Sequence, residues 1–222
     1  MRDPRYKLWP KELRPRDVTP AMVDPTISGG PTISSAPQLV ASASGRWRLV
    51  YHEVRFREEN ILKARALLAY LARSGRLYVG PMNGIYSPAG RANVATPTLA
   101  QFSNGYKLSS GYKLAQRIWD CTLDDDVKAG DVRIPVNNSP TAPLSAGDYF
   151  EIEGRLHVIQ EIRGDKWTIW PELRADYTFG TVLEIDDPRM LARLDPKSQA
   201  LACQMQLGWT GLATFEFLEE RW

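Results

Sequence analysis

The two histidines are the first residues to test for chemistry, because an imidazole can bind a metal or move a proton near neutral pH. His52 and His157 each fall inside a stretch that predicts a β-strand. Neither shows partners at the spacing that a metal or catalytic site needs. His157 lies between Leu156 and Val158, which is typical of a half-buried barrel residue. We therefore predict that neither histidine is catalytic or binds a metal.

Carboxylates form a second set of candidates. Asp124-Asp125-Asp126 could attract Ca²⁺, but the spacing, glycine and terminal glutamate of an EF-hand are missing, which favours a solvated acidic turn. Glu151 and Glu153 are two residues apart, so a strand would place both on one face, where they would simply face water. The carboxylates that could in principle supply a glycosidase pair are Asp148, Glu151, Glu153, Glu161 and Glu172.

Motifs for nucleophilic catalysis and phosphate binding are missing from the chain. There is no Gly-x-Ser-x-Gly and no paired Cys and His, and Gly29-Gly30 lacks the Lys-Ser/Thr of a phosphate loop. Cys121 and Cys203 are too few for a disulfide framework, and we expect two reduced, buried thiols. The prediction is a protein that is not an enzyme, with no catalytic, metal-binding or cofactor-binding residues and no cofactor.

Aromatic side chains could instead bind a ligand by stacking on sugars or bases. The candidates are Trp167, Trp170, Tyr149 and Tyr177. Within one strand the two tryptophans point to opposite faces, so one of them is expected in the core. That leaves no flat double platform, although a single stacking residue stays possible.

Composition limits the classes of partner. With 43% hydrophobic and 24% charged residues, the 222-residue chain is typical of a folded globular protein. A net charge of +2 gives no strong attraction to nucleic acid or to acidic lipids. The longest mainly apolar run, Ala66–Ala72, is too short to cross a bilayer, and Met1–Arg16 has no export-like apolar region. We expect synthesis in a cytoplasm, no membrane insertion and no nucleic-acid specificity.

The first forty residues predict an extended arm. Prolines stand at positions 4, 10, 15, 20, 25, 31 and 37, which excludes a long helix or a central strand. Met1–Arg16 also holds six Lys or Arg residues together with Trp9. A solvated tail is one interpretation, but it would not need Trp9, so we favour an arm over residues 1–40 that lies across a neighbouring subunit. Within it, Gly29-Gly30 predicts the turn of a small hairpin or a bent edge strand.

Residues 41–117 and 188–222 together predict a β-sandwich domain with one covering helix. Arg46–Phe56 alternates as a strand, and its phase switches near His52-Glu53, which indicates a bulge. An amphipathic helix is expected over 58–74, with Gly75 after its end, and a strand over Arg76–Val79. The final hairpin, Leu201–Leu207 with Ala213–Leu218, has no unit of its own and is expected to pair with the early strands.

Residues 118–187 predict an inserted small β-barrel of the OB or SH3 type. Turn residues separate five short strands that span only about 70 residues. The expected strands are Val132–Val136, Tyr149–Ile152, Leu156–Ile162, Trp167–Trp170 and Thr181–Ile185. Before them, residues 80–116 form a long stretch punctuated by Gly and Pro, which is expected to make contacts.

The assembled features resemble tail-tip proteins of long-tailed bacteriophages, and distal tail proteins in particular. The most specific similarity lies in LSAGDYFEIEGRLHVI (144–159), WTIWPELR (167–174) and Gly180-Thr181. The order of elements and the Gly45-Arg46-Trp47 strand start before the helix add to it. The resemblance implies a structural virion protein with no catalytic residues, which forms a ring, commonly hexameric, through its β-sandwich domain.

That resemblance also implies partners and a location. The expected partners are further copies of the chain, the tail tube protein and the baseplate or hub proteins, all within the phage tail. The fold would be mainly β: a β-sandwich with one helix, an inserted OB/SH3-like barrel and an extended proline-rich N-terminal arm. The alternative function is a carbohydrate-binding module that recognises host surface glycans.

Overall fold

The computed structural model describes residues 3–23, 26–31, 37–41, 45–57, 60–73, 75–81, 88, 121–138, 144–198, 200, 205–206 and 210–220. The described part is mainly β with one α-helix, which confirms the predicted fold class at this level. The chain divides into two compact units. One, here called the sheet unit, comprises Met1–Pro81, Glu153–Leu156 and Arg189–Trp222; the other, the barrel unit, comprises Met82–Ile152 and His157–Pro188.

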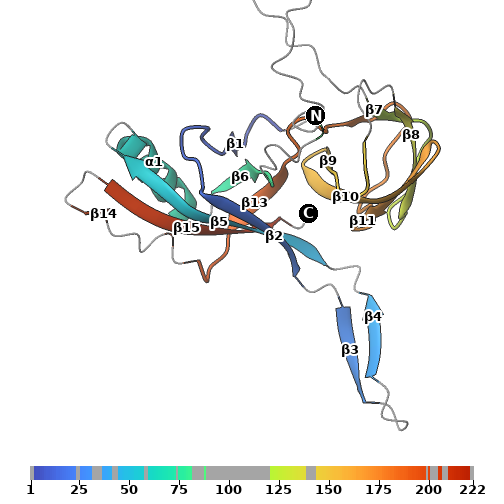
Figure 1. The fold of residues 1–222 in the computed structure, drawn as a ribbon, viewed down its shortest axis with the longest axis horizontal. Helices are drawn as coiled ribbons and strands as arrows, with labels where there is room; N and C mark the ends of the chain where they lie inside the picture. The colour runs from blue at the N-terminus through green and yellow to red at the C-terminus, as the bar shows by residue number, and fades with distance from the viewer. Residues whose placement is uncertain are drawn as a thin grey trace, which may run out of the picture. The chain divides into compact units, whose positions relative to one another are not determined.

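A seven-stranded sheet dominates the sheet unit (Figure 1). Its order is β1-β6-β13-β15-β5-β2, with β14 paired to β15; β1 and β6 are parallel, and the other pairs are antiparallel. The strands are β1 (Lys7–Leu8), β2 (Asp17–Val23), β5 (Arg46–Arg57), β6 (Arg76–Val79), β13 (Met190–Leu194), β14 (Met205–Gln206) and β15 (Thr210–Glu219). The predicted pairing of the terminal hairpin with the early strands is confirmed. Strand β13, placed between β6 and β15, was not predicted.

The predicted bulge in β5 is present. Glu53 has a positive φ of 48°, and the register with β15 shifts between Ala213 and Phe215, so two β5 residues oppose one β15 residue. This extra residue reverses the phase of the strand. As a result, one face of β5 stays buried along its whole length, through Trp47, Leu49, Tyr51, Val54 and Phe56.

The segment before β2 is folded onto its own chain, because Trp9 lies in the core with 2% of its surface exposed. Its indole Nε1 donates to the Leu13 carbonyl at 2.6 Å, and its backbone N–H donates to the Tyr78 carbonyl at 3.1 Å. Its ring makes edge-on contacts with three others, whose centroids lie 5.0, 5.2 and 5.6 Å away: Tyr51, Phe215 and Phe217.

The prediction of an arm laid across a neighbour is therefore wrong for residues 3–23. Their apolar anchors are buried within one chain, and β1 and β2 are the two ends of its sheet. The proline pattern correctly excluded a central strand, since Pro20 sits in β2, an edge strand that tolerates a missing donor.

Strands β3 (Thr26–Pro31) and β4 (Pro37–Ala41) form a separate two-stranded antiparallel sheet. The hairpin itself was predicted, but its turn was misplaced. Gly29-Gly30 lies inside β3, where the register shifts between Ser28 and Pro31, so these glycines serve an irregular strand instead of a turn.

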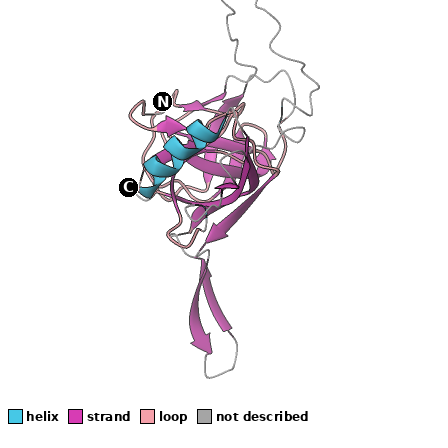
Figure 2. Cartoon of the chain, turned by 90° about the vertical axis from the view of Figure 1, so that its left-hand side faces the viewer, coloured by secondary structure: helices cyan, strands magenta, loops and turns pink. Residues whose placement is uncertain are grey.

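The single helix of the described residues, α1 (Ile61–Ala72), packs against β5 (Figure 2). It is shorter at both ends than the predicted 58–74, and its buried residues follow helical spacing: Ile61, Ala64, Leu67 and Leu71. Gly75 serves close approach and not a left-handed cap, because a Cβ there would lie 2.5 Å from the Tyr70 ring. A second sheet packed against this one, as a β-sandwich requires, stays a prediction.

The barrel unit holds a six-stranded, nearly closed sheet in the order β12-β7-β8-β11-β10-β9. Its strands are β7 (Cys121–Leu123), β8 (Arg133–Asn138), β9 (Tyr149–Ile152), β10 (Arg155–Arg163), β11 (Lys166–Trp170) and β12 (Val182–Leu183). Glu151 and Glu184 close the ring of strands by exchanging two backbone hydrogen bonds of 2.9 Å. Closure removes the exposed edges that would otherwise invite pairing with other chains. Strand β7 was not predicted.

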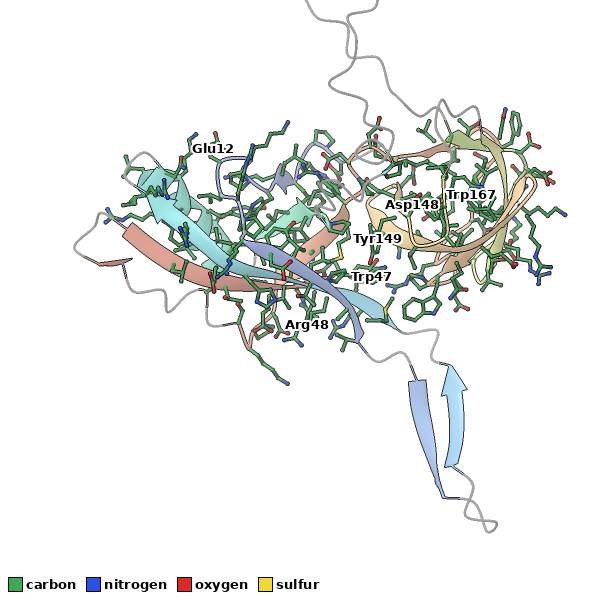
Figure 3. All side chains as sticks on the ribbon, in the orientation of Figure 1. Glu12, Trp47, Arg48, Asp148, Tyr149 and Trp167 are labelled. Carbon is green, nitrogen blue, oxygen red and sulfur yellow. The ribbon has the colours of Figure 1, made fainter. Side chains whose placement is uncertain are left out.

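Trp167, labelled in Figure 3, is the core tryptophan of the barrel, with 0% of its surface exposed. Trp170 is half-buried. The Phe150 ring packs against two other rings. It lies edge-on to Trp167, with ring centroids 5.7 Å apart, and it stacks on His157, with ring centroids 5.3 Å apart. The expectation that one of the two tryptophans is core is confirmed.

Replacing Trp9 by alanine should destabilise the sheet unit of the free chain by about 3–5 kcal/mol, the range for a large-to-small core change. Urea unfolding followed by circular dichroism measures this. The matched control is Leu8→Ala, because 49% of that side chain is exposed and the change should cost less than about 0.5 kcal/mol. Equal stability of the Trp9→Ala variant and the wild type would mean that residues 3–16 are only a tail.

The two barrel tryptophans should respond differently to the same substitution. Trp167→Ala removes a fully buried ring and should cost about 3–5 kcal/mol, while Trp170→Ala removes a half-buried ring and should cost clearly less. Thermal unfolding of both variants, compared with wild type, makes the test. A larger loss for Trp170→Ala would contradict the packing described above.

Candidate interaction surfaces

Both histidines have structural surroundings. His52 lies in β5 with its Nε2 3.0 Å from the Thr19 hydroxyl, and its carbonyl accepts the Arg16 N–H at 2.9 Å. His157 is 1% exposed and therefore more buried than predicted; its Nδ1 lies 2.9 Å from the Pro171 carbonyl oxygen. Each ring thus has a partner within its own sheet region, and the prediction that His157 is half-buried is wrong.

The carboxylates considered for catalysis do not gather. Glu151 is buried in β9, but Glu153 lies beyond the end of that strand with a φ of +47°, so the prediction that they share one strand face is wrong. Asp148 Oδ2 accepts the Ser145 N–H at 2.8 Å, and Glu161 pairs with its strand neighbour Arg163. Within the described ranges, no three His, Cys, Asp or Glu side chains form a group that could hold a metal ion.

The acidic turn at 124–126 has a structural role next to a second turn. All three aspartates are exposed, as predicted. Asp126 Oδ1 accepts the backbone N–H of Phe179 at 2.7 Å, and Asp125 Oδ1 accepts the N–H of Asp126 at 2.8 Å. Nearby, Cys121 is buried in β7, as predicted; Cys203 lies outside the described residues.

The neighbouring turn, Thr178–Thr181, holds an aromatic ring in solvent: 67% of Phe179 is exposed. The Thr178 carbonyl accepts both the N–H of Thr181 at 3.1 Å and its hydroxyl at 2.7 Å. Gly180 takes a φ of +78° and donates to the Leu123 carbonyl at 2.9 Å. These hydrogen bonds fix the backbone that carries the Phe179 ring, so the turn loses little conformational entropy on binding.

A second exposed surface lies on β5 and β15, on the sheet face opposite to the buried residues of β5. Arg55 pairs in register with Leu212, so their side chains share one face, and Arg57, two residues further along β5, lies on that face too. Both arginines are exposed, and 52% of Leu212 is exposed. Within the part of the chain that the structure describes, neither arginine forms an ion pair. We call Arg55, Arg57 and Leu212 the basic sheet surface.

Other arginines of the sheet unit lie near carboxylates. Arg48 of β5, labelled in Figure 3, pairs with Glu216 of the neighbouring strand β15. Glu220 lies 3.4 Å from Arg76 and 3.8 Å from Arg193. Arg55 and Arg57 differ from these arginines because neither forms an ion pair with a described residue.

Lys128 and Asp176 fix another exposed corner of the barrel. Asp176 accepts the Ala129 N–H at 2.9 Å and lies 3.2 Å from the Lys128 ammonium. The backbone hydrogen bond from Ala129, followed by Lys128, holds the pKa of Asp176 below its usual value. Its contribution to stability is therefore present above the unfolded pKa and is lost as the pH falls through the lower folded pKa.

Comparison with known proteins yields no relatives: no protein-family model and no curated protein matches this chain. The described residues contain no helix that is long and apolar enough to span a membrane.

Asp126→Ala should loosen the Phe179 turn. The hydrogen bond that it removes joins a charged acceptor to a backbone donor, a class that contributes about 1.5–3 kcal/mol, so amide exchange at Phe179 should accelerate about tenfold or more. Hydrogen exchange followed by NMR measures this rate. Asp124→Ala is the control, because that exposed carboxylate makes no hydrogen bond among the described residues. Unchanged exchange in Asp126→Ala would remove the argument for a preformed turn.

Proposed function

We propose that this chain is a structural subunit of a bacteriophage tail tip, similar to distal tail proteins, and that it forms a ring joining the tail tube to the baseplate or hub. The observation that carries the proposal is what the residues similar to those of tail proteins do in the fold. Every residue of the 144–174 segment that might have done chemistry, and whose contacts are described above, instead supports the fold.

The glycines and aspartate of this segment make turns. Gly147 has a φ of +95° and donates to the Ile159 carbonyl at 2.7 Å, while Asp148 closes the same turn on Ser145. Gly154 belongs to the sheet unit, where its carbonyl accepts the Leu191 N–H at 2.8 Å. A Cβ at Gly154 would lie 3.0 Å from the Tyr78 ring, so a larger residue would push on the sheet. These are constraints on architecture.

The apolar and aromatic residues of the segment fill the barrel. Phe150 and Trp167 are fully buried, and the Pro171 carbonyl oxygen lies within hydrogen-bonding distance of His157. A catalytic or sugar-binding segment would need polar or aromatic groups facing solvent. Because Trp167 is in the core, it is not accessible as a stacking residue for the glycan-binding alternative.

The order of elements also supports the proposal. The chain leaves the sheet unit after β6, forms the barrel, and returns as β13 and β15 between strands that it had already laid down. We propose that the sheet unit is the ring-forming β-sandwich domain and that the barrel is an OB/SH3-like insertion. The chain then works as a non-enzymatic virion protein whose partners are its own copies, the tail tube protein and the baseplate or hub proteins.

Mass photometry of the purified full chain tests the proposal. A ring should appear as one discrete multiple of the 25.0 kDa chain mass, and six copies are the expected number. A glycan array with the same sample supplies the comparison. A chain that stays monomeric up to micromolar concentration and binds glycans would support the carbohydrate-binding module instead.

A further inference from the structure

We infer that neighbouring copies in the ring contact each other through two elements of the sheet unit: the β3–β4 hairpin of one copy packs on the outer face of α1 of the next. This inference rests on the proposed ring and names the two surfaces that meet in it. Both elements belong to the sheet unit, so the contact is made by the domain that we propose forms the ring.

Helix α1 is apolar on two opposite faces, and only one of them is buried against β5. On the other face, Leu62, Ala66, Ala69 and Arg73 follow the helical spacing i, i+4, i+7 and i+11, and all four are exposed. The exposed fraction of Leu62 is 73%, and Figure 2 shows α1 on the outside of the sheet unit. We call these four residues the outer stripe of α1. Because helices that are apolar on every side are typically buried, the outer stripe is expected to have a partner outside the single chain.

The β3–β4 hairpin lacks the support that a two-stranded sheet needs. Among the described strands, β3 and β4 pair only with each other, in a register that includes Thr26↔Ala41 and Ile27↔Val40. Isolated two-stranded hairpins are at best marginally stable in water and gain stability by packing against another element. This hairpin therefore needs a surface to pack against.

The composition of the hairpin fits an apolar surface. Residues 25–45 contain no charged side chain, although 24% of the whole chain is charged. Soluble proteins commonly protect open strand edges with charges, and this stretch has none. Its strands contain Ile27, Leu39 and Val40, which gain free energy when they are removed from water. An uncharged hairpin of this kind suits the apolar outer stripe of α1.

The polar groups of the two elements also match. The open edges of β3 and β4 offer backbone carbonyl oxygens, which are acceptors. Arg73 of the outer stripe and the exposed Arg65 near it are donors that have no acceptor group. Helix α1 contains no acidic residue that would compete for these arginines.

The order of elements makes the contact head to tail. The hairpin leads into β5 at Arg46, whereas α1 follows the other end of β5, after Arg57. With 12 residues at about 3.3 Å each, β5 is about 40 Å long. The two surfaces are therefore connected to opposite ends of one strand, and each copy can bind two neighbours. Such a contact is heterologous, and it generates a closed ring when the rotation per copy closes.

Matched charge substitutions test the contact. One variant carries Ala66→Glu and Ala69→Glu on α1; the other carries Ile27→Lys and Leu39→Lys on the hairpin. Each variant alone should need about a tenfold or higher protein concentration than the wild type to form rings in mass photometry, because it places unpaired charges in an apolar contact. Mixed in equal amounts, the two should form rings again, since an alternating ring contains only wild-type contacts and Glu–Lys contacts.

Controls and a second readout make the test independent of how the variants fold. Asp165→Lys and Lys166→Glu are matched charge changes at exposed positions of the barrel unit and should assemble like the wild type. Hydrogen exchange followed by mass spectrometry needs no variant. The amides of β3 and β4 should exchange at least about tenfold more slowly in wild-type rings than in free copies, because packing stabilises the hairpin.

The outcomes separate this contact from the proposed function. Wild-type rings together with variants that assemble normally would overturn the contact and leave the ring intact. Variants that are folded by circular dichroism but are not rescued by mixing would also overturn it, as would wild-type rings in which β3 and β4 exchange as fast as in free copies. A wild-type chain that stays monomeric at micromolar concentration would overturn the ring itself, and the contact with it.

Discussion

Pairing between the early strand β5 and the last strand, β15, is the constraint on which the rest of this structure depends. Strand β15 aligns with β5 from Thr210↔Arg57 to Leu218↔Arg48, and β13 fills the place between β15 and β6. The ion pair between Arg48 and Glu216 joins residues 168 positions apart in sequence. The sheet cannot be complete until the last strand has been made, and forming such distant contacts has a large loop-closure cost. A dense aromatic core offsets that cost.

That core also uses polar groups that could otherwise bind a ligand. Rings from the bulged strand β5 and the last strand β15 pack edge-on around Trp9. Their polar atoms are used inside the fold: the Tyr51 hydroxyl donates to the Gly80 carbonyl at 2.7 Å, and the Trp47 indole donates to the Leu156 carbonyl at 2.7 Å. Buried Glu219 accepts the Trp47 N–H. Hydrogen-bonded buried polar groups of this kind specify one arrangement of the core.

Local sequence patterns predicted the elements whose structure depends mainly on the periodicity of neighbouring residues. The phase change in β5 follows from side-chain alternation alone, and Arg76–Val79 has the strand bounds that its apolar run indicates. Burial of Ile61 and Leu67 follows from helical periodicity in the same way. The strands that were missed are short. Each has one neighbour far away in sequence, β12 for β7 and β6 for β13, so the local pattern marks them weakly. Trp9 signalled burial, but its pattern could not reveal that the burial site lies in the same chain. The prediction that Glu151 and Glu153 share one strand face was wrong because β9 ends at Ile152, between the two residues.

We propose that this chain assembles as a structural subunit, and electron microscopy of the purified full chain tests this proposal most directly. The proposal predicts class averages of a closed ring of identical copies. A field of isolated single copies at micromolar concentration would contradict it.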